Sequence, residues 1–269
     1  MPTNPLAFLT NQPRPALIAM IHVGALPGTP RSQLTITQLI KSAVAEAALL
    51  AKHGADAIIL ENMHDLPYLN RNVGPEITAA MTAIASAVRS ATIMPLGLQI
   101  LAGANREALA VAHAASLQFI RCEGFVFAHV ADEGLMPMAD AGPLLRYRRM
   151  IGAENIAILA DIKKKHAAHA ITADIDLAET AQAAIFSGAD GVIVTGTATG
   201  HPANPADVEA VAQAIDHPVL VGSGCTPENA KLFAPHADAL IVGSYLKKDG
   251  AWENPPDPKR IKAMVKSLR

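Results

Sequence analysis

The chain has 269 residues, of which 51% are hydrophobic and 4% aromatic, and its formal net charge is −2 with histidine neutral. This charge lacks the basic excess of a nucleic-acid-binding surface, and no apolar run reaches the ~20 residues of a membrane span. We therefore expect no nucleic-acid partner and no integral membrane segment. The length matches the roughly 250 residues of one barrel of eight alternating strands and helices.

The cysteines and the N-terminus indicate the compartment. Cys122 and Cys225 are too few and too far apart for a disulfide framework or a zinc site, which is typical of a reducing environment. The first residues lack the basic stretch and the apolar run of a secretory signal. We expect a cytoplasmic protein in which both cysteines are small, buried hydrophobic side chains.

Eight short apolar runs alternate with helical patterns along the chain. Because these runs are rich in Val, Ile and Leu without strict polar alternation, they are typical of parallel strands covered on both faces. The expected strands are residues 16–22, 57–61, 95–100, 119–123, 156–162, 191–195, 218–222 and 239–243.

The helical segments between these strands begin and end on recognisable signals. Thr35 and Thr37 can cap the first helix, and Gly54 follows its last turn. Thr226, Pro227 and Glu228 predict a helix start after the seventh strand. The expected helices include residues 37–53, 75–89, 106–115, 174–187, 205–215 and 258–268.

Eight such alternations fit either an open sheet or a closed barrel. A repeated turn before the second, sixth and eighth strands favours the barrel; it reads Gly54-Ala55-Asp56, Gly188-Ala189-Asp190 and His236-Ala237-Asp238. No Gly-x-Gly-x-x-Gly follows the first strand, so a dinucleotide-binding fold is disfavoured and no cofactor is expected. The sequence predicts one (β/α)8 TIM barrel domain over residues 1–269, with residues 1–14 as an N-terminal extension packed on it.

Two loops rich in glycine and serine follow the last two predicted strands, and a glycine-threonine turn follows the sixth. TIM barrels often bind phosphate with the last two loops and a short extra helix, because glycine lets the backbone approach an anion and amide groups point at it. We predict that a small phosphorylated metabolite is bound by Gly222, Ser223, Gly224, Gly243, Ser244, Gly196 and Thr197. The alternative is that these glycines only permit tight turns.

Polar side chains stand at the carboxyl ends of six predicted strands, where a barrel carries its catalytic groups. Charged residues are rarely buried unless they are paired or used. The catalytic candidates are Asp161, Lys163, Glu61, His22 and Arg121. Structural roles stay open, with His22 as a core histidine and Arg121–Glu123 or Asp161–Lys163 as ion pairs.

The strand period sets an expectation for three consecutive lysines. Residues two apart on a strand share a face, so Lys163 should point into the barrel mouth beside Asp161, while Lys164 and Lys165 lie beyond the strand in solvent. Beside a carboxylate, Lys163 is expected to act as a fixed positive charge rather than through a Schiff base.

A metal site is the alternative use of the same polar ring. Its ligands would be His22, Glu61, Asp161 and His166. However, none of the compact ligand motifs of zinc or calcium proteins is present, and no metal is predicted.

Two connections, residues 124–138 and 164–172, are longer than the 2–6 residues that a strand-to-helix turn typically needs. Long loops at the active face of a barrel often act as lids. We expect one or both to close over bound ligand and to bring His129 or His166 toward the site.

Specific motifs occur from the first strand to the last helix. They are Met20 to Pro30 (MIHVGALPGTP), Gly97 to Leu101 (GLQIL), Phe119 to Arg121 (FIR), Asp161 to His166 (DIKKKH), Val194 to Gly196 (VTG), Val221 to Asn229 (VGSGCTPEN) and Ile241 to Gly250 (IVGSYLKKDG). On these residues the chain resembles the BtpA/SgcQ family over almost its whole length. The opening and closing motifs are the most specific.

The resemblance implies a barrel related to the ribulose-phosphate-binding enzymes. The family is named after a photosystem I biogenesis factor, other members sit among sugar-metabolism genes, and no catalytic residue carries over from it. Many members have an Asn-Asp pair after the third strand where this chain reads Ala102-Gly103-Ala104-Asn105-Arg106. A role for that Asp therefore does not transfer.

These observations favour an enzyme that acts on a sugar phosphate or a similar metabolite as an isomerase, epimerase or lyase. A carboxylate would move a proton next to a carbonyl, Lys163 or Arg121 would stabilise the oxyanion, and His22 or His166 would be the second acid or base. The alternative is a non-catalytic assembly, biogenesis or regulatory factor on the same scaffold. A homodimer is expected as the commonest assembly.

Overall fold

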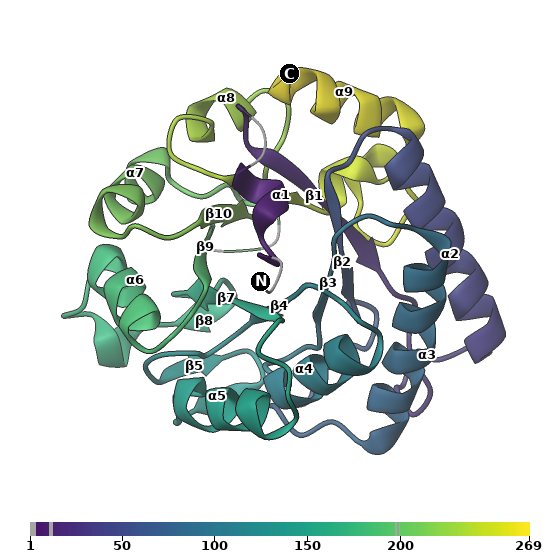
Figure 1. Cartoon of the computed structure of the whole chain (residues 1–269), viewed down its shortest axis with the longest axis horizontal. Helices are drawn as coiled ribbons and strands as arrows, with labels where there is room; N and C mark the ends of the chain where they lie inside the picture. Colours follow the sequence, from purple (N-terminus) through teal and green to yellow (C-terminus); the bar gives the residue numbers. More distant parts are fainter. Residues whose placement is uncertain (1–3, 11–12, 197, 199) are drawn as a thin grey trace.

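The computed structural model describes residues 4–10, 13–196, 198 and 200–269. Eight parallel strands close into a barrel that helices surround (Figure 1), which confirms the predicted fold. Around the barrel the order is β1 (Ala16–His22), β11 (Ala239–Val242), β10 (Val219–Gly222), β9 (Gly191–Thr195), β7 (Ala157–Ile162), β4 (Phe119–Cys122), β3 (Leu96–Gln99) and β2 (Ala57–Glu61). Every predicted strand is present, with its ends within one residue of those expected.

The outer helices follow the strands in chain order. They are α2 (Ile36–Lys52), α3 (Pro75–Ala91), α4 (Asn105–Ala114), α5 (Ala141–Met150), α6 (Leu177–Phe186), α7 (Pro205–Ala214), α8 (Ala230–Phe233) and α9 (Pro258–Leu268). Thr35 caps α2 in a capping box with Gln38, as one of its two predicted caps. The start predicted at Thr226 is wrong: α8 begins only at Ala230, and Thr226 donates its backbone N–H to Asn229 within a preceding turn.

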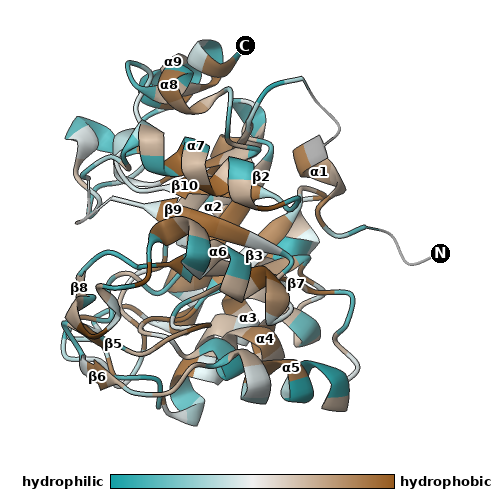
Figure 2. Ribbon diagram, turned by 90° about the vertical axis from the view of Figure 1, so that its left-hand side faces the viewer, coloured by the Kyte–Doolittle hydropathy of each residue, from teal (hydrophilic) through white to brown (hydrophobic). Residues whose placement is uncertain are grey.

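The strands divide their side chains between two cores. Along β1, Ala16, Ile18 and Met20 point into the barrel, while Leu17 and the other alternate residues face the helices. The strands accordingly form a continuous hydrophobic band through the molecule (Figure 2). The period of two continues to the carboxyl end of each strand, so it places His22 at the mouth of the barrel.

A short helix, α1 (Ala7–Thr10), covers the amino end of the barrel. Leu6 and Leu9 are buried among the inward-facing strand residues, and the Phe8 ring stacks on Phe119 with centroids 5.7 Å apart. Figure 2 shows α1 at one end of the barrel and a second, small sheet at the other. The amino end is therefore plugged, and the carboxyl end carries the polar groups.

The two long connections predicted as lids pair with each other. β5 (His129–Ala131) and β6 (Gly134–Met136) form a hairpin after β4, and β8 (Ala167–Ala168), from the connection after β7, adds to it in antiparallel orientation. This three-stranded sheet, hereafter the lid sheet, was not predicted as strands. It joins the connections of two neighbouring barrel strands.

No helix in the described part of the chain is long and apolar enough to cross a membrane.

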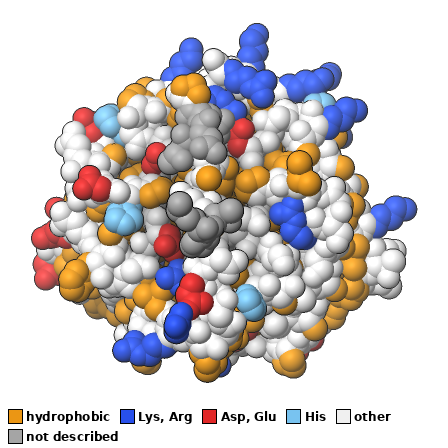
Figure 3. All heavy atoms as spheres, in the orientation of Figure 1, with side chains coloured by type: hydrophobic (Ala, Val, Ile, Leu, Met, Phe, Trp, Pro, Cys, Tyr) orange, Lys and Arg blue, Asp and Glu red, His pale blue; other side chains and the backbone are white. Residues whose placement is uncertain are grey.

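The remaining surface carries its positive charge unevenly. Helix α9 contains Lys259, Arg260, Lys262 and Lys266 without an acidic residue. Figure 3, which views the α1 end, shows Lys and Arg side chains gathered over this helix.

Candidate active site

The carboxyl ends of the barrel strands surround a cavity of about 180 Å³, hereafter the cup cavity. The loops after β10 and β11 form one side of it. Side chains from β1, β2 and β4 and from the connection after β7 form the other. The predicted site residues in its lining are His22, Glu61, Arg121, Ser223, Gly224, Gly243 and Ser244.

Two glycines shape the anion side of the cup cavity. A Cβ on Gly243 would lie 2.8 Å from His22 Nε2, and one on Gly224 would lie 2.3 Å from the Pro202 nitrogen. Gly224 also has a φ of +61°, which glycine adopts without strain. Ser244 opens η2 (Ser244–Leu246), the short extra helix after the last strand. The backbone here can approach an anion closely.

Two other predicted cup residues, Gly222 and Gly196, do not line this cavity. Gly222 lies beneath the Arg121 guanidinium, where a Cβ would come within 3.7 Å of Nη2. Gly196 packs on the His201 carbonyl, from which a Cβ would lie 2.1 Å away. Thr197 is outside the described residues. The Ser223 hydroxyl donates to the Ala198 carbonyl (3.0 Å), so only its backbone is available to the cup.

Arg260, which the sequence did not indicate, supplies a cation to the lining of the cup cavity. Its Nε donates to the Tyr245 carbonyl (2.6 Å), and its guanidinium carbon lies 4.2 Å above the centre of the Tyr245 ring. Tyr245 thereby fixes the guanidinium beside the loop after β11. A basic residue in the first turn of the last helix was the one available signal.

Arg121 and Asp161 form a buried, two-bonded ion pair between β4 and β7. Arg121 Nε and Nη2 donate to the two Asp161 oxygens at 3.0 and 2.9 Å, and the side chains are 5% and 1% exposed. Burial opposes the charge of Arg121, yet Asp161 raises the pKa of Arg121 above its ordinary value. Asp161 therefore positions Arg121 instead of facing the cup cavity, contrary to its predicted place as the proton-moving carboxylate.

The predicted orientation of the three lysines is wrong. Lys163 has a φ of 45°, so the backbone leaves the strand conformation directly after Ile162 and the strand period no longer applies. Its Nζ donates to the Thr172 and Ile175 carbonyls, away from the mouth. Lys165 instead lines the cup cavity.

Glu61 and Lys165 are two titratable groups of the mouth whose pKa values shift in opposite directions. Burial raises the pKa of Glu61, although Arg121 and Lys165 oppose the rise. Burial and then Arg121 lower the pKa of Lys165, and Glu61 opposes the fall. A buried carboxyl with a raised pKa beside an amine with a lowered pKa is the arrangement that acid/base chemistry near neutral pH requires.

His22 is held as a neutral imidazole. Its Nδ1 donates to the Trp252 carbonyl (2.9 Å), which leaves Nε2, the nitrogen beside Gly243, as a hydrogen-bond acceptor. Burial, with a further contribution from Lys247, lowers the pKa of His22 to about 3. His22 thus offers the cup cavity an acceptor without charge.

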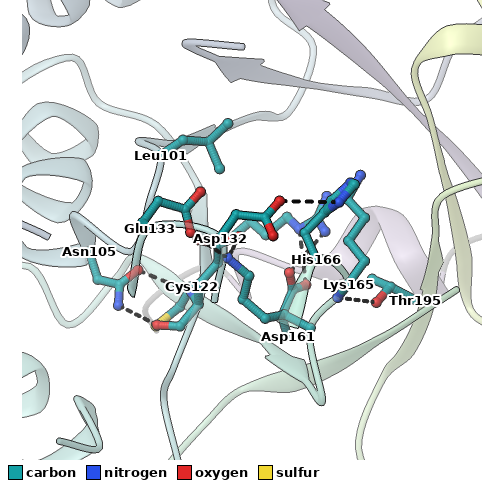
Figure 4. A network of polar contacts seen from close by, with 12 residues as sticks. Leu101, Asn105, Cys122, Asp132, Glu133, Asp161, Lys165, His166 and Thr195 are labelled. Carbon is teal, nitrogen blue, oxygen red and sulfur yellow. Dashed lines mark hydrogen bonds and ion pairs between the residues drawn. The ribbon is translucent and has the colours of Figure 1, made fainter. Parts of the chain in front are cut away.

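A second cavity of about 400 Å³, hereafter the lid chamber, lies under the lid sheet. It shares Glu61, Met63, Arg121 and Lys165 with the cup cavity, so the two cavities adjoin each other. The lid closes over it through Asp132 and His166, whose Oδ2 and Nδ1 are 3.6 Å apart (Figure 4).

The two histidines expected from the lid lie in different cavities. His166 lines the lid chamber. His129 faces a separate small cavity with Lys163, and its ring centre is 5.6 Å from that of His169. His129 is therefore not brought to the mouth in this structure.

The four residues considered for a metal do not come together. Within the described residues, no three His, Cys, Asp or Glu side chains gather closely enough to hold a metal ion. Asn105, from the segment that departs from many family members, bonds instead to the Glu123 backbone and to Asp140.

Comparison of the fold with solved structures gives barrel enzymes. The chain resembles (S)-3-O-geranylgeranylglyceryl phosphate synthase from Thermoplasma acidophilum, with a TM-score of 0.63, 18% identity and coverage of 98% of this chain and 96% of that one. It also resembles thiamine phosphate pyrophosphorylase from Pyrococcus furiosus, with a TM-score of 0.58, 15% identity and coverage of 94% and 95%. At such identities the likeness extends to the fold alone.

Sequence comparison gives much closer relatives. A mitochondrial protein of Caenorhabditis elegans is 48% identical over 97% of this chain and 95% of its own length. The photosystem I biogenesis protein BtpA of Synechocystis is 35% identical over 97% of this chain and 90% of its own. The family model described as the BtpA family matches residues 13–269. The chain therefore belongs to the BtpA family.

Proposed function

We propose that this protein is an enzyme that binds a small phosphorylated metabolite across the mouth of its barrel and transfers a proton within it. The carrying observation is a single cavity that is lined at one end by glycines and Arg260 and elsewhere by the buried Glu61 and by Lys165. A phosphate at the first end would accept hydrogen bonds from backbone amides near Gly224, Gly243 and Ser244. The positive charge of the Arg260 guanidinium would attract it further.

The chemistry proposed for the other end is acid/base catalysis next to a carbonyl. Glu61 would take a proton from the carbon beside the carbonyl and return it on the same or the neighbouring atom. Arg121 and Lys165 would stabilise the oxyanion that develops on the carbonyl oxygen, and His22 Nε2 would accept a hydrogen bond from a substrate hydroxyl. These steps suit an isomerase or an epimerase acting on a sugar phosphate; in a lyase the same enolate would instead expel the group on the next carbon, which leaves with the bonding electron pair.

The fold relatives support a phosphorylated ligand. The Thermoplasma structure contains the substrate sn-glycerol-1-phosphate, and the Pyrococcus enzyme is named for thiamine phosphate. A phosphate site after the last two strands is a common feature of such barrels.

A thermal-shift experiment tests the binding step. Inorganic phosphate and a set of pentose and hexose phosphates should raise the Tm of the wild type, because a ligand of the native state stabilises by mass action. Gly243→Ala should abolish the rise, since its Cβ would crowd His22. Gly142→Ala on the outer helix α5 is the matched control. An equal rise in all three proteins would place the anion elsewhere.

Proton transfer is tested separately in deuterium oxide. Each stabilising ligand is incubated with the protein, and NMR follows deuterium entering the carbon next to the carbonyl. Incorporation that disappears in Glu61→Gln supports the proposed chemistry. Stabilisation by ligands without deuterium incorporation would contradict it.

A non-catalytic biogenesis factor is the second candidate, favoured by the name of the Synechocystis relative. It predicts no substrate turnover and no need for Glu61. The cytoplasmic location and the homodimer stay predictions. Because the C. elegans relative is named as mitochondrial, the mitochondrion is a second location to test.

A further inference from the structure

The lid chamber contains hydrogen-bond acceptors that the protein itself leaves unpaired. Within the described residues, Gln99 Oε1 and Glu123 Oε2 are buried side-chain atoms without a hydrogen-bond partner, and Glu133 Oε2 has only an ion-pair contact with Lys164 Nζ. Gln99 and Glu123 are 2% and 5% exposed, and all three residues line the chamber. Unpaired buried acceptors destabilise a protein, so such a concentration in one cavity points to a ligand that donates hydrogen bonds.

The chamber does not need a cationic ligand, because its carboxylates already face a cation. Lys164 Nζ lies 3.4 Å from Glu123 Oε1 and 3.6 Å from Glu133 Oε2. Burial opposes the charge of Lys164, yet Glu123 and Glu133 raise the pKa of Lys164 above its ordinary value. The unpaired atoms are thus better matched by neutral donors such as hydroxyl groups.

Part of the lining of the chamber is apolar. Leu66, Pro67, Leu101 and Trp252 line it, and the Tyr68 hydroxyl is turned away to donate to the Met63 carbonyl (2.7 Å). Figure 4 shows Leu101 near the carboxylates of Asp132 and Glu133. The carbon chain of a sugar combines the two matching surfaces, since its C–H groups are apolar and its hydroxyl groups are donors.

We propose that the lid chamber is a second binding subsite that takes the hydroxyl-bearing carbon chain of an open-chain sugar phosphate, with Gln99, Glu123 and Glu133 accepting hydrogen bonds from the sugar hydroxyls. The proposal rests on the proposed function, because the phosphate of the same ligand would occupy the cup cavity. The reacting carbon would then lie at the junction of the two cavities, where Glu61, Arg121 and Lys165 line both.

Calorimetric titration tests the subsite with inorganic phosphate and with a set of pentose, hexose and heptose phosphates. At least one sugar phosphate should bind the wild type about tenfold or more tightly than inorganic phosphate, as expected for several added hydrogen bonds. Gln99→Leu, which keeps the volume but removes the acceptor, should lose most of this gain and keep its affinity for inorganic phosphate. Gln213→Leu on the exposed face of α7 is the control.

Each result decides one claim. If inorganic phosphate binds and no sugar phosphate binds more tightly, or if Gln99→Leu keeps the gain, the subsite is refuted and the phosphate cup stands. If no phosphate compound binds, the proposed function itself fails. Tenfold tighter binding of glucosamine 6-phosphate than of glucose 6-phosphate would assign the chamber to an ammonium group and overturn the proposal. Glu133→Met, outside the barrel, repeats the test should Gln99→Leu not fold.

Discussion

Glu61 is held in an environment that disfavours its own charge. Burial raises its pKa, so the folded state binds the proton more tightly than the unfolded state does, and this contribution to stability is lost as pH rises through the folded-state pKa. We expect Glu61→Gln to lower turnover about 10²-fold or more while raising the Tm at pH 8. The gain in Tm should shrink toward pH 4. Scanning calorimetry across this range checks it, and a Tm below wild type at pH 8 would contradict it.

Protonation of His22 has the opposite effect on the stability of the fold. Its pKa falls from 6.5 to about 3 on folding, so the unfolded state binds its proton first and stability falls as pH drops below 6.5. Below pH 6.5, we expect His22→Gln to reduce the loss in the free energy of unfolding by up to about 1.4 kcal/mol per pH unit. Urea unfolding at pH 7 and pH 5 measures the difference. The exposed His113→Gln is the control, and equal pH slopes in both variants would contradict the prediction.

The lysines after β7 give a direct comparison at one site. Lys165 lines both cavities and Lys163 holds the chain at Thr172 and Ile175. Lys165→Met should therefore lower turnover about 10²-fold, and Lys163→Met should mainly reduce stability. Borohydride trapping with mass spectrometry of the substrate complex adds a second readout. A stable adduct on Lys165 would replace the electrostatic role with a Schiff base.

Residue positions were predictable from the sequence as far as the strand conformation lasts. His22, Glu61 and Arg121 follow the inward period of their strands and reach the mouth as expected. The period fails at Lys163, because a positive φ begins one residue after β7. For Arg260 the sequence offered only a basic residue in the first turn of the last helix, since its distance from the cup depends on closure of the whole barrel.

At the scale of elements, α1 is a separate stabilising unit at the amino end of the barrel. Leu9 is 3% exposed and packs among inward-facing strand residues. We expect Leu9→Ala to lower the free energy of unfolding by about 2–5 kcal/mol, as for other buried leucines. Ile93→Ala, at a side chain that is 99% exposed, should change it by about 0.5 kcal/mol or less. Chemical unfolding of both variants decides, and a small loss in Leu9→Ala would mean that α1 detaches readily.

The lid sheet is the second such element. It was missed as strands because β8 has two residues and β5 and β6 three each, too short for a visible alternation. Asp132 and Glu133, in the turn between β5 and β6, line the lid chamber, so a ligand there should slow hydrogen exchange at the β5 and β6 amides. The amides of α9, which follows β11 on the opposite side of the barrel, should not change. Equal exchange in β5 and β6 with and without a tight ligand would count against a lid.

For the whole molecule, the barrel and its closure were predictable from the sequence because each strand is buried on both faces and each turn repeats a local pattern. The contacts that join the ends of neighbouring strand-and-helix units were not predictable. Asp161 with Arg121, and β8 with β5, are contacts between segments about 40 residues apart, and local periodicity carries no record of them.

The placement of the lid sheet has a consequence for the history of the family. Asp132, Glu133 and His166 line the lid chamber only, whereas the cup cavity is built from the loops after β10 and β11. Insertions or substitutions between residues 124 and 138 can therefore reshape one chamber while leaving the other intact. Relatives that diverge in this segment should share the anchoring group of their ligands and differ in the rest, so that one ancestral scaffold yields distinct metabolic specialisations.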